Sequence, residues 1–128
     1  MLAARLICAL SALVCLLVGV WSLLDPAGVA GMIGYVFAGP AGQVEFVTVY
    51  GGFYTGLGAF LALAAIRKDW LVAGLAMSTL GAGGALVARL AGTLALGTAP
   101  GLTLNLLISE VIWAAASALG WYLATRRG

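Results

Sequence analysis

The sequence predicts an all-α membrane protein, a bundle of four transmembrane helices with a short interfacial or re-entrant segment between the first two. Hydrophobic residues make up 64% of the 128 residues and charged residues only 8%, whereas soluble domains are roughly half apolar. A helix needs about 20 apolar residues to cross the hydrocarbon core of a bilayer. The chain holds four such runs and little else, which predicts a single transmembrane domain over residues 1–128.

The four apolar runs define the expected helices, at about residues 3–24, 44–66, 71–90 and 103–123. Residues 25–42 are rich in Gly and Pro but also carry Met, Ile, Tyr and Phe. This stretch is too short to span a membrane and too apolar for a solvated loop, so we expect it to be interfacial or re-entrant. A short charged turn follows the second helix, and a run of small residues, 91–102, follows the third.

Basic residues near the ends of the expected helices predict the orientation of the chain in the membrane. Four spans place both termini on one side, and only Arg89 then lies toward the other side. The bases on the side of the termini are Arg5, Arg67, Lys68, Arg126 and Arg127. This asymmetry predicts a multi-pass membrane protein with both termini in the cytoplasm.

Nineteen glycines in this chain need an explanation, because glycine is a poor helix former in water. In membranes, small residues let helices approach closely. Gly52 and Gly56 have the GxxxG spacing next to Gly51, and Gly81 and Gly84 belong to rows of small residues in the third helix. We expect these five glycines to pack the helices of the bundle; the alternatives are a homodimer interface and a cleft for a flat lipophile.

Three charged residues, Glu45, Arg89 and Glu110, lie in the expected helices on the side away from the termini, where a charged side chain is costly and usually functional. Counting 1.5 Å per residue from the cytoplasmic bases places Glu45 and Arg89 at one level near the outer boundary and Glu110 about 7 to 9 Å deeper. A long arginine side chain reaches across that separation. We therefore expect one cluster in which Arg89 lies between two carboxylates.

This cluster has three interpretations: it fixes helix register, it binds a ligand or ion, or it contacts a partner protein. For the ligand site, we expect Arg89 to meet a polar or anionic head group and the two glutamates to orient Arg89. The walls of that site would come from the aromatic residues Tyr50, Tyr54 and Trp113.

The composition also argues against several classes of function. The chain has no His, and Cys8 and Cys15 are its two thiols, so we expect no zinc or haem site and no cofactor. General acid–base chemistry would fall to Glu, Tyr and Arg alone, which makes an enzyme the least supported class. The basic residues form no binding patch, so we expect no nucleic-acid partner.

A longer pattern resembles a known family. It comprises EFVTVYGGFYTGLGAF at residues 45–60, GGALVARL at residues 83–90, and the glutamate of the last helix. This pattern resembles bacterial four-helix membrane proteins of unknown function that are related to DoxX-like proteins. The resemblance implies a four-helix fold in the bacterial cytoplasmic (inner) membrane and implies no activity. It carries over as signature positions Glu45, Tyr50, Gly51, Gly52, Arg89 and Glu110.

Our leading hypothesis is a membrane-embedded binding module for a lipophilic molecule with a polar or anionic head. The expected partner is then a membrane lipid or a lipophilic small molecule. One alternative is an accessory or assembly subunit of a larger membrane complex, suggested by the small size of the chain; self-association into a homo-oligomer stays open. A second alternative is a proton-coupled small-molecule transporter in which Glu110, the deeper acid, carries the proton.

Overall fold

The computed structural model describes residues 1–97 and 101–126, and these residues contain helices and no strand. Four helical stretches are long and apolar enough to cross a membrane by length and composition. They are Leu2–Leu24, Pro40–Ile66, Leu71–Leu96 and Leu102–Thr125. The predicted four-helix membrane fold is confirmed, and the chain is a multi-pass membrane protein. Arg127, one of the bases used to predict orientation, lies outside the described residues.

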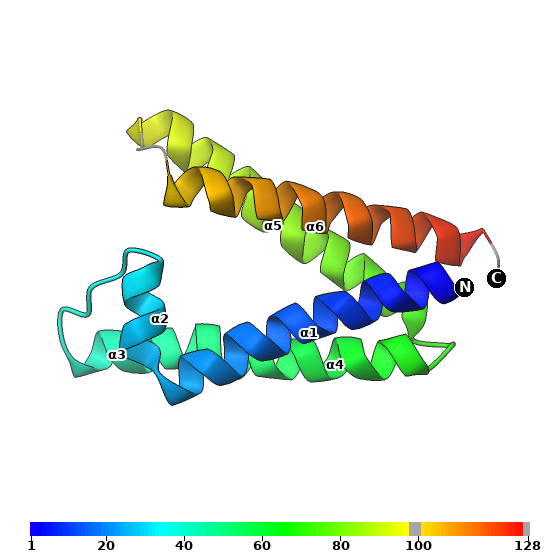
Figure 1. The fold of residues 1–128 in the computed structure, drawn as a ribbon, viewed down its shortest axis with the longest axis horizontal. Helices are drawn as coiled ribbons and strands as arrows, with labels where there is room; N and C mark the ends of the chain where they lie inside the picture. The colour runs from blue at the N-terminus through cyan, green and yellow to red at the C-terminus, as the bar shows by residue number, and fades with distance from the viewer. Residues whose placement is uncertain (98–100, 127–128) are drawn as a thin grey trace.

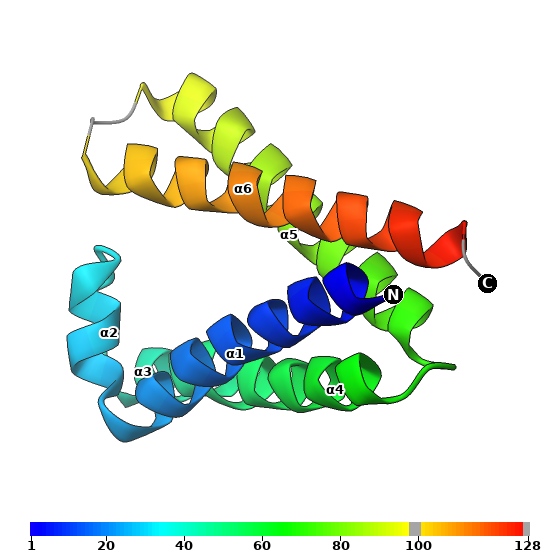
Figure 2. The ribbon, with the colours of Figure 1, turned by 45° about the vertical axis from the view of Figure 1, so that its right-hand side comes forward.

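The segment after the first span contains a short helix. α1 (Leu2–Leu24) ends at Asp25, and α2 (Pro26–Met32) follows at once. The Asp25 side chain accepts a hydrogen bond from the backbone N–H of Gly28 at 3.0 Å. Pro26 lies in the first turn, where the N–H that proline lacks would have no partner within the helix. Figures 1 and 2 show α2 standing at a steep angle to α1, so the chain turns sharply at Asp25.

The second span is built from three consecutive pieces. They are α3 (Pro40–Phe46), the π-helical stretch η1 (Val47–Phe53) and α4 (Tyr54–Ile66). The span begins at Pro40 rather than at the expected residue 44, because proline is well suited to the first turn of a helix. The sequence pattern does not predict η1; π-helical turns are rare and are frequent at functional sites.

The third and fourth spans are α5 (Leu71–Leu96) and α6 (Leu102–Thr125). α5 continues six residues past the expected end at residue 90 and stops at Gly97, whose φ of 59° is left-handed and suits glycine. Much of the expected small-residue connection, 91–102, is therefore helical. Residues 98–100 of that connection lie outside the described residues.

The four spans form two hairpins. α1 packs along α4, and α5 packs along α6. Figures 1 and 2 show the hairpins meeting at the end that holds both chain termini and diverging toward α2. Where they meet, the bundle core buries Cys8, Cys15, Leu61, Leu71 and Leu75 completely.

The glycines at close helix contacts differ from those expected. Of the five expected, only Gly51 lies against a neighbouring helix; a Cβ there would be 2.6 Å from Leu23 Cδ2. At Gly56, Gly81 and Gly84 a Cβ would meet no described atom within 4 Å, and at Gly52 it would meet only its own helix. The prediction of packing within the bundle is wrong for these four. Neither the GxxxG spacing in the second span nor the rows of small residues in α5 identify by themselves the packed face of a helix. The other close contacts are at Gly19, Gly58, Gly74 and Gly120.

Candidate functional site

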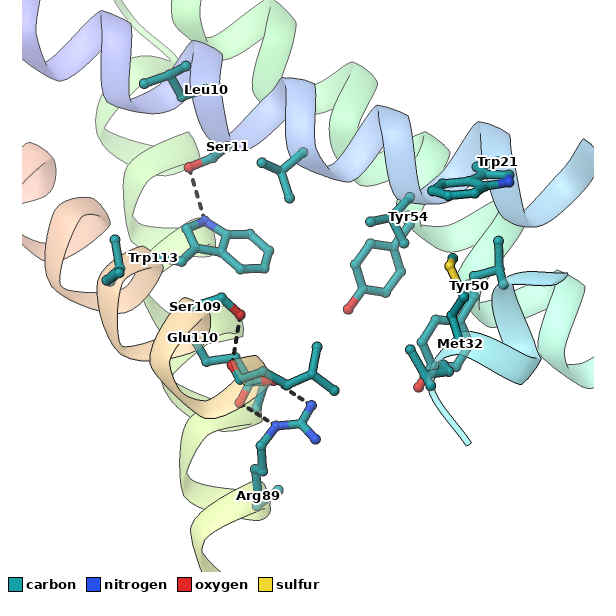
Figure 3. Close-up of a pocket in the computed structure, with 18 of the residues that line it drawn as sticks. Leu10, Ser11, Trp21, Met32, Tyr50, Tyr54, Arg89, Ser109, Glu110 and Trp113 are labelled. Atoms are coloured by element: carbon teal, nitrogen blue, oxygen red, sulfur yellow. Dashed lines mark hydrogen bonds and ion pairs between the residues drawn. The ribbon is translucent and has the colours of Figure 1, made fainter. Parts of the chain in front are cut away.

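A cavity of about 870 Å³ lies between the two hairpins, where α2 also lines it. This volume falls in the range of about 300 to 1,000 Å³ that is typical of small-molecule sites. Most of the side chains on its walls are apolar. Five of the six residues predicted to bind a ligand line it, from three of the four spans: Tyr50, Tyr54, Arg89, Glu110 and Trp113. Figure 3 shows the last three of these on one side of the cavity and the two tyrosines on the other.

Arg89 and Glu110 form a two-point ion pair on the α5–α6 side of the cavity. The Arg89 Nε and Nη2 atoms donate to Glu110 Oε2 and Oε1, both over 2.7 Å. This parallel geometry is the one in which a guanidinium binds a carboxylate best. The two side chains are 31% and 12% exposed. The pair therefore borders the cavity and places equal and opposite charges on its wall.

Glu45 does not join this pair, which corrects the predicted three-residue cluster. Glu45 is exposed on α3, it is not part of the cavity wall, and no salt bridge within 4 Å involves it among the described residues. The depth count gave the level of each charge along the bundle but not the direction in which its side chain points. The divergence of the hairpins then separates α3 from α5 (Figure 1).

Aromatic rings form a ladder along the second span. Phe46, Tyr50 and Tyr54 follow one another at four-residue intervals, and their centroids lie 4.6 Å and 5.9 Å apart with nearly parallel planes. Tyr35 packs edge-on against Tyr50, and the two hydroxyl groups lie 3.3 Å apart. The Tyr54 hydroxyl points into the cavity (Figure 3). This wall therefore offers flat apolar faces and phenolic donors.

A buried serine network lies beside the cavity, in the core that joins three spans. Ser78 of α5 lies 2.8 Å from Ser117 of α6 and donates to Ser11 of α1 over 3.2 Å. The Trp113 indole N–H is shared between Ser11 and Ser78, at 3.0 Å from each oxygen. The network holds the Trp113 ring in place on the cavity wall.

Nothing in the sequence pattern groups these serines. Ser11 and Ser117 are each flanked by apolar residues, Ser78 stands next to Thr79, and serine is common in transmembrane helices. The one usable signal is that Ser117 lies a helical turn from Trp113. The sequence predicts Trp113 as a wall residue. Its hydrogen bonds depend on how three helices are rotated relative to one another, which the sequence pattern does not show.

The arrangement suits an amphipathic ligand. One part of the cavity presents an ion pair and tyrosine hydroxyls, while the rest is lined by side chains such as Leu10, Val14 and Ile112. A few placed polar groups in an otherwise apolar cavity is the usual composition of a small-molecule site.

The comparison with known proteins covers nearly the whole chain. No curated protein and no solved structure matches it. Residues 3–121 match a family described as a domain of unknown function, DUF4345. The matched region includes every residue that lines the cavity. The chain therefore belongs to the DUF4345 family.

Proposed function

We propose that the protein is a membrane-embedded binding module for a lipophilic molecule with a polar head, which occupies the cavity between the two hairpins. One observation supports this most strongly. Five residues chosen for their chemistry from separate parts of the sequence line a single cavity with otherwise apolar walls. Ionisable residues that face a cavity inside a membrane protein commonly mark a functional site.

The head of the ligand must supply most of the selectivity. A lipid tail that moves from the bilayer into an apolar cavity gains little, because the bilayer is as apolar as the cavity wall. Selective binding therefore needs polar contacts that the bilayer interior does not offer. Arg89 and Tyr54 present such contacts on opposite sides of the cavity.

We also propose that both termini face the cytoplasm of a bacterial inner membrane, and that the family is related to DoxX-like proteins. The termini and the α4–α5 turn lie at one end of the bundle (Figure 1), and so do the bases in these segments. Two of these bases pack on aromatic rings: Arg67 over Trp70 at 5.1 Å and Arg126 over Tyr122 at 4.4 Å. Basic residues and aromatic belts together are typical of a cytoplasmic membrane interface.

Native mass spectrometry of gently solubilised protein tests the binding proposal. We expect a retained lipophile on the wild type and none on Ala88→Phe, whose new ring would fill the cavity next to Arg89. Ala91→Phe is the matched control, because Ala91 is exposed on the same helix and does not line the cavity. A wild-type protein without any adduct, or equal adducts on Ala88→Phe, would contradict the proposal.

A further inference from the structure

We infer that the head group of the bound lipophile is uncharged and accepts hydrogen bonds, as ester, ketone or hydroxyl oxygens do. The inference rests on the proposed function and narrows it, because the sequence alone leaves an anionic head open. It follows from the charge balance of the cavity wall and from the donors that remain without partners.

The charges on the cavity wall cancel. Among the described residues that line the cavity, Arg89 and Glu110 are the charged ones, one of each sign. An anionic head would have to displace Glu110 from both of its 2.7 Å contacts, or lie beside a carboxylate without a cation of its own. Like charges repel strongly where the dielectric constant is low, and an uncompensated charge inside a membrane is costly. The cavity therefore disfavours an anion.

The wall also carries hydrogen-bond donors that have no partner in the part of the chain that the structure describes. Arg89 uses Nε and Nη2 for Glu110, so Nη1 has no acceptor among the described residues. The Tyr54 hydroxyl forms no hydrogen bond with the residues drawn in Figure 3, where it faces the space that the guanidinium borders. By contrast, the Trp113 N–H is already bonded to serines. A donor that faces an apolar cavity inside a membrane gains from an acceptor, since unpartnered polar groups are costly in apolar surroundings. Oxygen acceptors on the ligand therefore complete this site.

Photo-crosslinking in nanodiscs tests the inference with three probes that share the same diazirine-bearing acyl chains. They are a diacylglycerol with a neutral ester and hydroxyl head, a phosphatidic acid with an anionic head, and a phosphatidylcholine with a zwitterionic head. Each is added at the same low mole fraction to unlabelled phosphatidylcholine, and labelled residues are mapped by mass spectrometry. We expect the diacylglycerol to label cavity residues at least about tenfold more than the phosphatidic acid.

Two variants test the donors and the charge. Tyr54→Phe keeps the ring and removes the hydroxyl, so we expect diacylglycerol labelling to fall about fivefold. Tyr122→Phe is the control, since Tyr122 does not line the cavity. Glu110→Gln leaves the wall with a net positive charge, and phosphatidic acid labelling should then rise about tenfold.

The outcomes separate the claim of a neutral head group from the claim that the cavity binds a lipophile. Cavity labelling by phosphatidic acid or phosphatidylcholine that equals or exceeds that by diacylglycerol would overturn the neutral head while supporting a lipophile site. Absence of cavity labelling by all three probes would overturn the site itself. The wild-type comparison decides between these results even where a variant does not fold.

Discussion

Arg89 of α5 holds Glu110 of α6 through two parallel hydrogen bonds of 2.7 Å, so that two spans share one ion pair beside a cavity. A lone charge in a membrane span would be costly, whereas a paired one is tolerated. The pair therefore has a structural role in joining α5 to α6. It also sets the charge of the space between the hairpins.

Replacing one partner of the ion pair should destabilise the protein more than replacing both. We expect Arg89→Met to lower the free energy of unfolding by about 1 to 3 kcal/mol, because Glu110 loses its partner. The double variant Arg89→Met, Glu110→Met should recover part of this loss, since no unpaired charge remains. Steric trapping or detergent titration of the two single variants and the double variant measures the coupling. Strictly additive losses would show that the pair contributes nothing as a pair.

The stability of the bundle should depend most on the serine at the centre of the network, Ser78. Ser78→Ala removes the hydroxyl that links Ser11, Ser117 and Trp113, and we expect a loss of about 1 to 3 kcal/mol in the free energy of unfolding. Trp113 fluorescence should shift as well, because its N–H loses one acceptor. Ser109→Ala is the control, because that hydroxyl is exposed and bonds only to a carbonyl of its own helix. Equal effects of the two substitutions would be inconsistent with the network.

Two glycines of α5 should respond in opposite ways to alanine. A Cβ at Gly74 would lie 2.5 Å from the Ala64 Cβ, so Gly74→Ala should destabilise the bundle by about 1 to 3 kcal/mol through overpacking. At Gly81 there is open space, and alanine is the better helix former by about 1 kcal/mol. We therefore expect Gly81→Ala to leave stability unchanged or slightly raised. Thermal unfolding of both variants checks this, and a large loss at Gly81 would reveal a contact with another molecule.

The two thiols should be protected in the folded protein. Cys8 and Cys15 are completely buried, and the Cys8 thiol donates to the Leu61 carbonyl. A membrane-permeable maleimide should therefore label neither residue until detergent or heat unfolds the bundle. Rapid labelling of the native protein would contradict the packing of α1 against α4.

The fold could be predicted from the sequence because its cause is local. Each span is a run of apolar residues long enough to cross a bilayer, and such runs are visible without knowledge of their neighbours. The predicted ends of the helices were less accurate: α5 continues past its expected end at residue 90 and stops only at Gly97. Small residues alone do not end a helix in a membrane protein, so composition was a poor guide there.

The site could be predicted only in part, because it depends on how the helices rotate about their axes. Arg89 and Glu110 were expected together and do pair, but Glu45 points elsewhere. Its level along the bundle was inferred from residue counts, which contain no information on helix rotation. The same limit applies to Ser78 and to Gly74, whose partners come from other spans.

A crystal structure of the wild-type protein grown from a lipidic mesophase would test the binding site itself. We predict nonprotein density between Tyr54 and Arg89, with a head that shows oxygen-to-nitrogen contact at the guanidinium and a tail that follows the apolar wall toward Leu10. A structure in which the hairpins close and the space between Tyr54 and Arg89 disappears, with no ligand between them, would contradict the proposed function.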